Sequence, residues 1–167
     1  MPGSDTRDYK QDTGESLYRR SVYTFWKRSA PPASMEIFNA PNRETCTVRR
    51  DRTNTPLQAL VTLNDVQFIE AARHLAQVTM TAEATTPGRV AFLAAKLLGR
   101  PLTAEEAAIV TKIQADLAAS YKLKPDEAKK LLAVGESKPE AKLDPAELAA
   151  WTMVVNQLLN LDEVLCK

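Results

Sequence analysis

Helix start signals recur from Thr55 to the C-terminus, and they constrain the fold more than any other feature of this sequence. Three of them place a capping residue directly before a proline: Thr55 before Pro56, Thr86 before Pro87, and Asp144 before Pro145. A hydroxyl or carboxylate side chain caps free backbone N–H groups at a helix start, and proline suits the first helical position because it has no N–H. The apolar residues between these signals are spaced by three and four, with almost no alternation of period two. The sequence therefore predicts an all-α fold.

Two further patterns resemble capping boxes, in which a cap residue and the residue three positions later satisfy each other's backbone. Asn64 with Gln67 predicts a new helix after a sharp bend near Asn64. Thr103 with Glu106 predicts the start of a long helix that ends at Pro125. That helix carries Val110, Ile113, Leu117 and Tyr121 on one face, and a shorter helix over 126–134 follows it and ends at Gly135. We expect an irregular bundle of about six helices over residues 57–167.

The last predicted helix, which begins after Asp144, is apolar around most of its circumference. Its apolar positions are Leu148, Trp151, Val154, Val155, Leu158, Leu161 and Leu165. They leave a narrow polar stripe of Thr152, Asn156, Asn160 and Glu163. A helix that is apolar nearly all round belongs in the interior of a protein. We therefore expect this helix to lie near the middle of the bundle.

Residues 1–56 follow a different pattern, rich in loops. The spacing predicts a helix over 16–28 with Leu17, Val22 and either Phe25 or Trp26 turned inward, ended by two prolines. A short helical turn is expected over 34–38, and residues 39–54 read as a long loop because they show no sustained period. Since 167 residues suit one domain, we expect this segment and the bundle to form one domain overall.

Cations and aromatic residues concentrate in this early segment. Between Arg19 and Arg52 there are eight Lys or Arg residues against three acidic residues, with five aromatic residues between Tyr18 and Phe38. The candidate binding residues are Arg19, Arg20, Trp26, Lys27, Arg28, Arg43, Arg49, Arg50 and Arg52. Arginine binds carboxylate, phosphate and sulfate groups in a bidentate manner, and aromatic rings stack on sugars and bases.

Three interpretations of this cationic segment stay open. It could bind an anionic polymer, and the net charge of +1 favours a sulfated polysaccharide over nucleic acid. Alternatively, its arginines could hold the loop to the bundle by pairing with Glu44, Asp51, Asp162 or Glu163. The third interpretation is a docking surface for upstream domains of the same protein or for a separate protein partner.

The sequence gives little support for catalysis or metal binding. The single histidine, His74, lies in the middle of a predicted helix. Cys46 lies among arginines, which would favour its thiolate form, although a small buried apolar group is the simpler interpretation. We expect Cys46 and Cys166 to be free thiols, and they are too far apart in the chain to suggest a metal site. No catalytic residue, metal ligand or glycine-rich phosphate loop is expected.

No apolar run is long enough to span a membrane as a helix. The N-terminus, MPGSDTRDYKQD, lacks the basic and apolar regions of a secretory signal. Either the protein is cytoplasmic, or the chain is a piece of a longer exported protein.

Several long strings carry a family resemblance: YKQDTGESLYRRSVYTFWKRSAPP, FNAPNRETCTVRRDRTNTPLQALVTLND, LLGRPLTAEE, LLAVGES and DPAELAAWTMVVNQLLNLDE. They cover nearly everything from Tyr9 to Glu163. With these strings the chain resembles the C-terminal part of domain-of-unknown-function family 1553, a planctomycete-specific domain of large proteins that also carry cytochrome-c-like regions. The resemblance implies an exported or envelope-associated protein and suggests that this chain is a fragment of a larger one.

The resemblance brings no established activity and no assigned catalytic residue. Cys46 is followed by Thr47, Val48 and Arg49, so it does not form the C-x-x-C-H motif of covalent haem attachment. We therefore expect no cofactor in this chain. The expected function is a non-catalytic helical module for assembly or partner binding. The alternatives are a sulfated-glycan binding module and a part of a redox or hydrolytic enzyme completed by upstream domains.

Overall fold

The structure is a computed structural model that describes residues 12–27, 31–42 and 44–166. The described residues form eight α-helices, six of them seven residues or longer, and no strand. The predicted all-α fold is confirmed. The chain divides into two compact units, residues 1–58 and residues 59–167, which are described separately.

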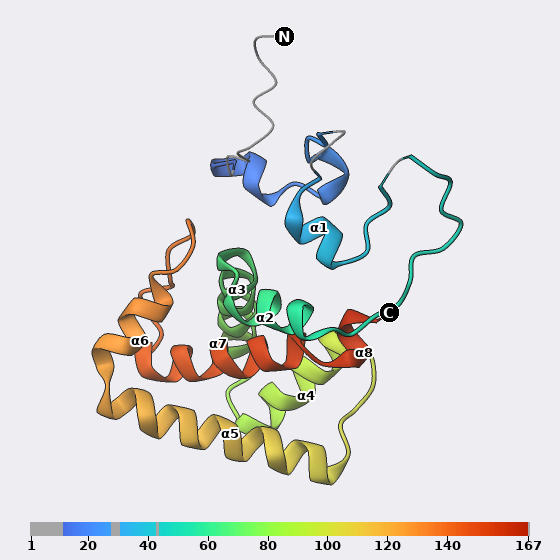
Figure 1. Ribbon diagram of the computed structural model, residues 1–167. Helices are drawn as coiled ribbons and strands as arrows, with labels where there is room; N and C mark the ends of the chain where they lie inside the picture. The colour runs from blue at the N-terminus through green and yellow to red at the C-terminus, as the bar shows by residue number, and fades with distance from the viewer. Residues whose placement is uncertain (1–11, 28–30, 43, 167) are drawn as a thin grey trace. The chain divides into compact units, whose positions relative to one another are not determined.

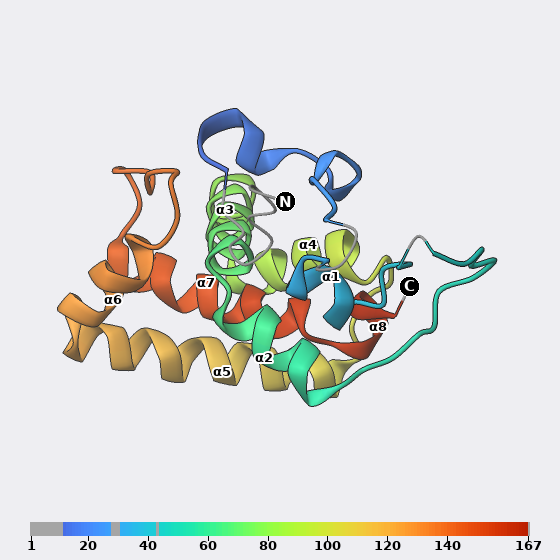
Figure 2. The same ribbon diagram turned by 45° about the horizontal axis from the view of Figure 1, so that its top comes forward.

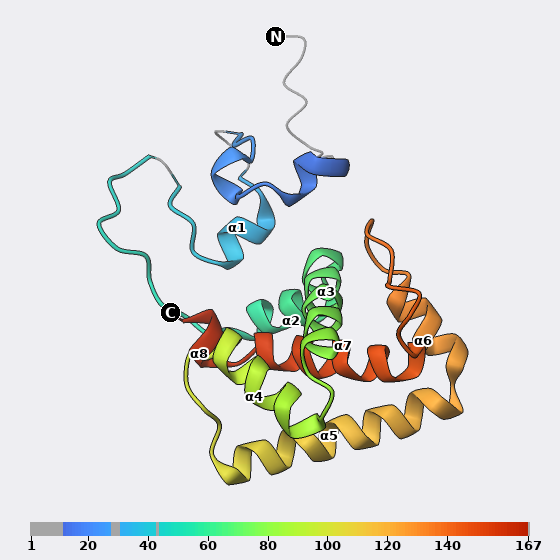
Figure 3. The same cartoon turned by 180° about the vertical axis from the view of Figure 1, so that it is seen from behind.

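The second unit is a helical bundle arranged around one helix. Its elements are α2 (Pro56–Asn64), which starts in the first unit, α3 (Val66–Ala82), α4 (Thr86–Leu97), α5 (Ala104–Leu123), α6 (Pro125–Leu132), α7 (Pro145–Leu159) and α8 (Asp162–Leu165). Helix α7 lies between α3 and α5 in all three ribbon views (Figure 1, Figure 2, Figure 3). It also contacts α4, α6 and α8. The expectation that this helix lies near the middle of the bundle is confirmed.

Helix α7 is buried around most of its circumference, including two of its polar positions. Trp151 and Val155 have no exposed surface, and neither do Thr152 and Asn156. The predicted polar stripe is therefore itself buried at these two residues. Each has a partner that makes burial tolerable, because the Thr152 hydroxyl donates to the Leu148 carbonyl at 2.7 Å and the Asn156 amide donates to the Thr62 carbonyl at 2.9 Å.

The sequence pattern predicts one helix through Leu165, but the chain breaks between α7 and α8. The break follows Asn160, whose side-chain oxygen accepts a hydrogen bond from the Thr62 hydroxyl at 2.7 Å. Leu161 then takes an extended conformation before α8 begins. The end of α7 thus coincides with a side-chain contact to α2, which is distant in the sequence. The local sequence contains no glycine or proline stop signal at this position.

Two of the predicted helix starts are confirmed in detail. Thr103 and Glu106 form the reciprocal capping box at the start of α5. The Asp144 side chain accepts a hydrogen bond from the Glu147 N–H at 2.9 Å at the start of α7. Both caps satisfy N–H groups that the first helical turn leaves without a partner.

Two other starts are shifted by one residue. Helix α3 is capped by Asp65, which accepts from the Gln67 N–H at 2.8 Å, while the predicted cap Asn64 donates back to the Leu60 carbonyl and ends α2. Helix α4 is capped by Thr85 in place of Thr86, and it places Pro87 within the first turn. Adjacent residues with capping side chains make such shifts common, because either one could satisfy the same N–H groups.

The bundle core joins residues from every long helix. Ala72, Leu93, Leu148, Trp151 and Val155 are fully buried within it. Helix α5 packs on this core through the predicted face of Val110, Ile113, Leu117 and Tyr121. Val110 is nevertheless the only residue of this helix that is classed as buried, at 9% exposure, so the rest of its surface is partly or fully exposed.

The first unit contains short elements only. In place of the predicted helix over 16–28 it forms two 3₁₀ helices, η1 (Gly14–Tyr18) and η2 (Ser21–Tyr23), separated by extended residues. Of the residues expected to face inward, Val22 is 68% exposed and Leu17 is half-buried; of the two alternatives, Phe25 is 73% exposed and Trp26 is half-buried. A helix of this length is marginal unless it buries an apolar face, which explains the difference. Helix α1 (Ala33–Ile37) confirms the predicted helical turn, and the described part of 39–54 is a loop.

Candidate functional site

The structure places seven of the nine predicted binding residues, all in the first unit. Arg19, Arg20, Arg49, Arg50 and Arg52 are exposed, and Trp26 and Lys27 are half-buried. Arg28 and Arg43 lie outside the described residues. Arg19 and Arg20 separate the two 3₁₀ helices, whereas the other three described arginines lie on the loop that follows α1.

This loop is closed at its base by hydrogen bonds from two amide side chains. Asn39 donates to the Asp51 carbonyl at 3.2 Å and to the Thr53 hydroxyl at 2.6 Å. Asn39 has a φ of 54°, a conformation that asparagine tolerates better than most residues. Gln58, which is buried, donates to the Ile37 carbonyl at 2.8 Å and to the Thr53 hydroxyl at 3.0 Å. These hydrogen bonds hold the two ends of the loop together, and Arg49, Arg50 and Arg52 lie on the loop between them.

Large apolar side chains accompany the arginines at the surface. Tyr18 is 59% exposed, Val22 68%, Tyr23 65%, Phe25 73% and Val48 102%. Gln58 is the one buried residue in the described part of the first unit. The described apolar residues of this unit are therefore exposed or half-buried, and they do not build a buried core.

Two of the ion-pair partners predicted for the arginines, Glu44 and Asp51, lie in the first unit with them. Within the described part of the first unit, none of the five described arginines forms an ion pair with Glu44 or Asp51. Glu163, another predicted partner, instead pairs with Arg100 at 2.7 Å. The described arginines therefore form none of the ion pairs predicted within the first unit, and pairing with Asp162 or Glu163 of the second unit stays a prediction.

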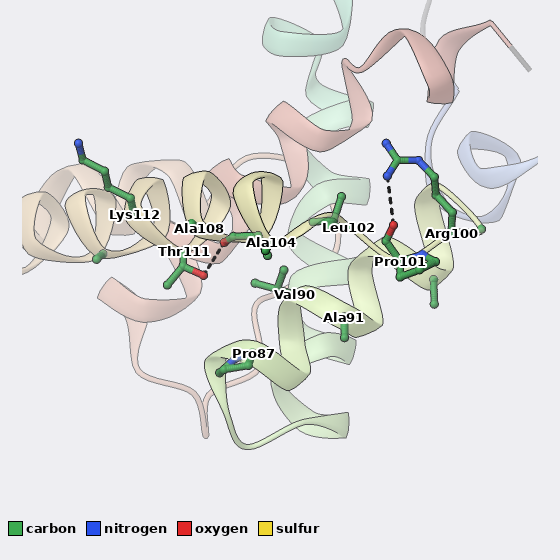
Figure 4. Close-up of a pocket in the computed structure, with 14 residues that line it drawn as sticks. Pro87, Val90, Ala91, Arg100, Pro101, Leu102, Ala104, Ala108, Thr111 and Lys112 are labelled. Carbon is green, nitrogen blue, oxygen red and sulfur yellow. Dashed lines mark hydrogen bonds between the residues drawn. The ribbon is translucent and has the colours of Figure 1, made fainter.

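The second unit has an apolar groove of about 910 Å³ between α4 and α5. Figure 4 shows one wall formed by Pro87, Val90 and Ala91 on α4, and the other formed by Ala104, Ala108 and Thr111 on α5. The Thr111 hydroxyl donates to the Ala107 carbonyl at 2.7 Å, so it is satisfied within its own helix. Arg100 and Lys112 are the charged residues that line the groove.

Arg100, in the loop between α4 and α5, binds residues of α5 and α8 at one end of this groove. Its guanidinium donates to Glu106 of α5 at 2.9 and 3.0 Å and to Glu163 of α8 at 2.7 and 2.9 Å. The hydrogen bonds that Arg100 donates to Glu163 and then to Glu106 raise the pKa of Arg100 further above its usual range. The hydrogen bond from Arg100, followed by that from the Thr103 N–H, lowers the pKa of Glu106 from 4.5 to about 2. The Glu106 carboxylate is thus held in the ionised form.

This network predicts a stability change in acid. The folded pKa of Glu106 lies below its unfolded value, so the stabilisation is fully present above about pH 4.5 and is lost as the pH falls toward about 2. NMR titration of the Glu106 side-chain carboxyl should give a midpoint near 2 in the native chain. In the Arg100→Gln variant the midpoint should return toward about 4.3. A native midpoint that already lies in this ordinary range contradicts the network.

Two buried arginines of the second unit were missed by the sequence reasoning. Arg73 is 1% exposed and donates to the carbonyls of Leu132, Val134 and Ser137, and it lies 3.5 Å from Glu70. Arg89 is 9% exposed, pairs with Glu147 and lies over the Trp151 ring at 5.7 Å from its centroid. One sequence signal could have indicated the buried position of Arg73. Glu70 and Arg73 form an i,i+3 pair on one helix face, directly beside the apolar residue Ala72.

The remaining candidates lie apart from one another or at the surface. His74 is exposed on α3, and both cysteines are free, as expected, with Cys46 exposed and Cys166 half-buried. A search of residues 12–27, 31–42 and 44–166 finds no cluster of three His, Cys, Asp or Glu residues that could hold a metal ion. Over the same residues, every helix is too short or too polar to cross a membrane.

Comparison with known proteins gives one family. No curated protein and no solved structure matches the chain. The family PSD1, described as a protein of unknown function (DUF1553), matches residues 1–114. The match includes all the predicted binding residues and extends to the middle of α5, while the strings LLAVGES and DPAELAAWTMVVNQLLNLDE lie beyond it. Since the match spans more than half of the 167 residues, the chain belongs to the DUF1553 family.

Proposed function

We propose that the chain is a non-catalytic helical module for assembly or partner binding within a larger, envelope-associated protein. The observation that carries this proposal is the exposed surface of the first unit, where Tyr18, Tyr23, Phe25 and Val48 are more than half exposed. Envelope association is what the family resemblance implies.

The composition of this surface is that of a protein interface. Aromatic residues and arginine are enriched in interface centres, whereas lysine and acidic residues are depleted there. Burying one such apolar side chain against a partner contributes about 1.5–3 kcal/mol to the free energy of binding. Two or three of these side chains together therefore contribute substantially to the affinity for a partner. The hydrogen bonds of Asn39 and Gln58 hold the arginine-bearing loop at its base. This restraint lowers the conformational entropy that the loop loses on binding.

Site-specific photo-crosslinking in the native cells tests the proposal. A photoreactive phenylalanine analogue at Phe25 should give a discrete crosslinked product that mass spectrometry identifies as a protein domain. The matched control is the same analogue at Leu123, which is 84% exposed at the end of α5. Crosslinking at Phe25 that does not exceed crosslinking at Leu123 contradicts the proposal.

A second candidate, binding of an anionic polysaccharide, is favoured by the state of the arginines. Arg49, Arg50 and Arg52 are exposed on one loop, and none has an ion pair with a described residue of its unit. If this candidate is right, the chain binds heparin at low ionic strength and elutes as salt rises, because counterions compete for the arginines. Reversing the charge at Arg49 and Arg50 should weaken retention, whereas reversal at Lys138 and Lys142, which lie in an exposed loop of the second unit, should change it less. No retention at low salt eliminates this candidate.

A further inference from the structure

The groove between α4 and α5 lies entirely in the second unit. We propose that it receives an amphipathic α-helix of a protein partner, with small or medium apolar residues on one face and an acidic residue opposite Lys112. The inference goes beyond the proposed function because it uses no residue of the N-terminal segment.

The walls of the groove have the shape that a helix requires. Ala91 and Ala95 line it from α4, while Ala104, Ala108 and Ala115 line it from α5. Such small side chains allow another helix to approach closely and to set its ridge of side chains between the two walls. The α5 wall, from Ala104 to Ala115, is about 17 Å long at 1.5 Å per residue, which matches about three turns of a helix.

The groove is also open to solvent along its outer side. Sites for small molecules usually enclose most of the surface of their ligand. An open trough instead covers one face only, which is how a groove binds an amphipathic helix. Helix α5 has exposed surface to offer to such a partner, because Val110 is its only buried residue.

The charges along the groove select the partner. Arg100 is neutralised by Glu106 and Glu163, so it offers little attraction to a further anion. Lys112 is exposed and has no ion pair or hydrogen bond with any described residue. It stands on the α5 wall at the end remote from Arg100 (Figure 4). An acidic side chain on the bound helix would complete this site, whereas a lysine there would be repelled.

The test uses two stapled helical peptides of about 14 residues with alanine and leucine at i, i+3, i+4 and i+7. One carries glutamate beside the apolar face, and its twin carries lysine. Fluorescence polarisation should show that the whole chain binds the glutamate peptide at least about tenfold more tightly than the lysine twin. Lys112→Glu should reverse this preference, and the matched Lys122→Glu change, farther along α5, should not.

A steric variant separates the groove from other surfaces. Ala108→Glu places a charge in the groove and should abolish peptide binding, whereas Ala119→Glu, at an exposed position of the same helix outside the groove, should leave it intact. Thermal unfolding of each variant checks that the bundle is folded. Equal binding of both peptides, or full binding by Ala108→Glu, overturns the proposal. Displacement of the peptide by dodecanoate, or a dimer that Ala108→Glu dissociates, assigns the groove to a small anionic lipid or to a second copy of the chain and also overturns it.

Discussion

Replacing Arg73 with methionine is expected to lower the free energy of unfolding by about 3–5 kcal/mol, because it breaks a buried ion pair from one side. Arg73 is 1% exposed and joins α3 to the end of α6 and the loop after it through the carbonyls of Leu132, Val134 and Ser137. Its partner Glu70 is 4% exposed and accepts a hydrogen bond from the Ser137 N–H at 2.6 Å. Without the guanidinium, the Glu70 carboxylate is left buried without its counter-charge. Urea unfolding followed by circular dichroism measures the loss.

Two controls show that the effect comes from the buried pair. Arg49→Met removes an exposed arginine and should change the free energy of unfolding by less than about 0.5 kcal/mol. The double variant with methionine at both Glu70 and Arg73 should recover a large part of the loss, since no buried charge is left uncompensated. A single Arg73→Met variant that is as stable as the native chain shows that the pair does not hold the loop.

Truncating Trp151 to alanine is expected to cost about 3–5 kcal/mol, the usual range for a fully buried aromatic residue. Trp151 has no exposed surface and lies on α7, between the helices that this helix holds together. The loss also removes the ring that the buried guanidinium of Arg89 faces at 5.7 Å. The same unfolding measurement applies.

Trp26 provides a matched comparison, because it is the second tryptophan and is only half-buried in the first unit. Trp26→Ala should cost less than about 1.5 kcal/mol, since much of the ring stays in contact with water in the native chain. Equal losses for the two variants would show that α7 is not the centre of the core.

Local rules predicted the parts of the fold that depend on neighbouring residues. The caps at Thr103 and Asp144 and the apolar face of α5 could be predicted because a cap and a 3.6-residue period need no distant contact. The helix over 16–28 failed because its formation depends on packing, and Val22 and Phe25 are exposed. The prediction of one continuous helix through Leu165 was wrong for a related reason. The chain breaks after Asn160, and the side chain of Asn160 is bound by Thr62, which is far away in the sequence.

The candidate site shows the same division. The cations and aromatic residues of the first unit were visible from composition alone, and their exposure agrees with a surface role. The groove was not visible, because alanines spaced by four on α4 and α5 have the same pattern as any exposed helix face. Arg73, Arg89 and Arg100 were missed because an isolated arginine in a helical pattern is usually exposed, and only the folded chain brings their partners close.

We propose that the helical bundle folds stably without the N-terminal segment, and that the N-terminal segment contacts a partner. Urea unfolding of a fragment of residues 53–167 beside the whole chain tests it most directly. The fragment keeps Thr55, whose hydroxyl caps the Gln58 N–H at 3.3 Å, and the complete core around α7. Its free energy of unfolding should agree with that of the whole chain within about 1 kcal/mol, because none of the removed residues that the structure describes is a fully buried apolar residue. A fragment that does not fold, or one that loses more than about 3 kcal/mol, would contradict this account.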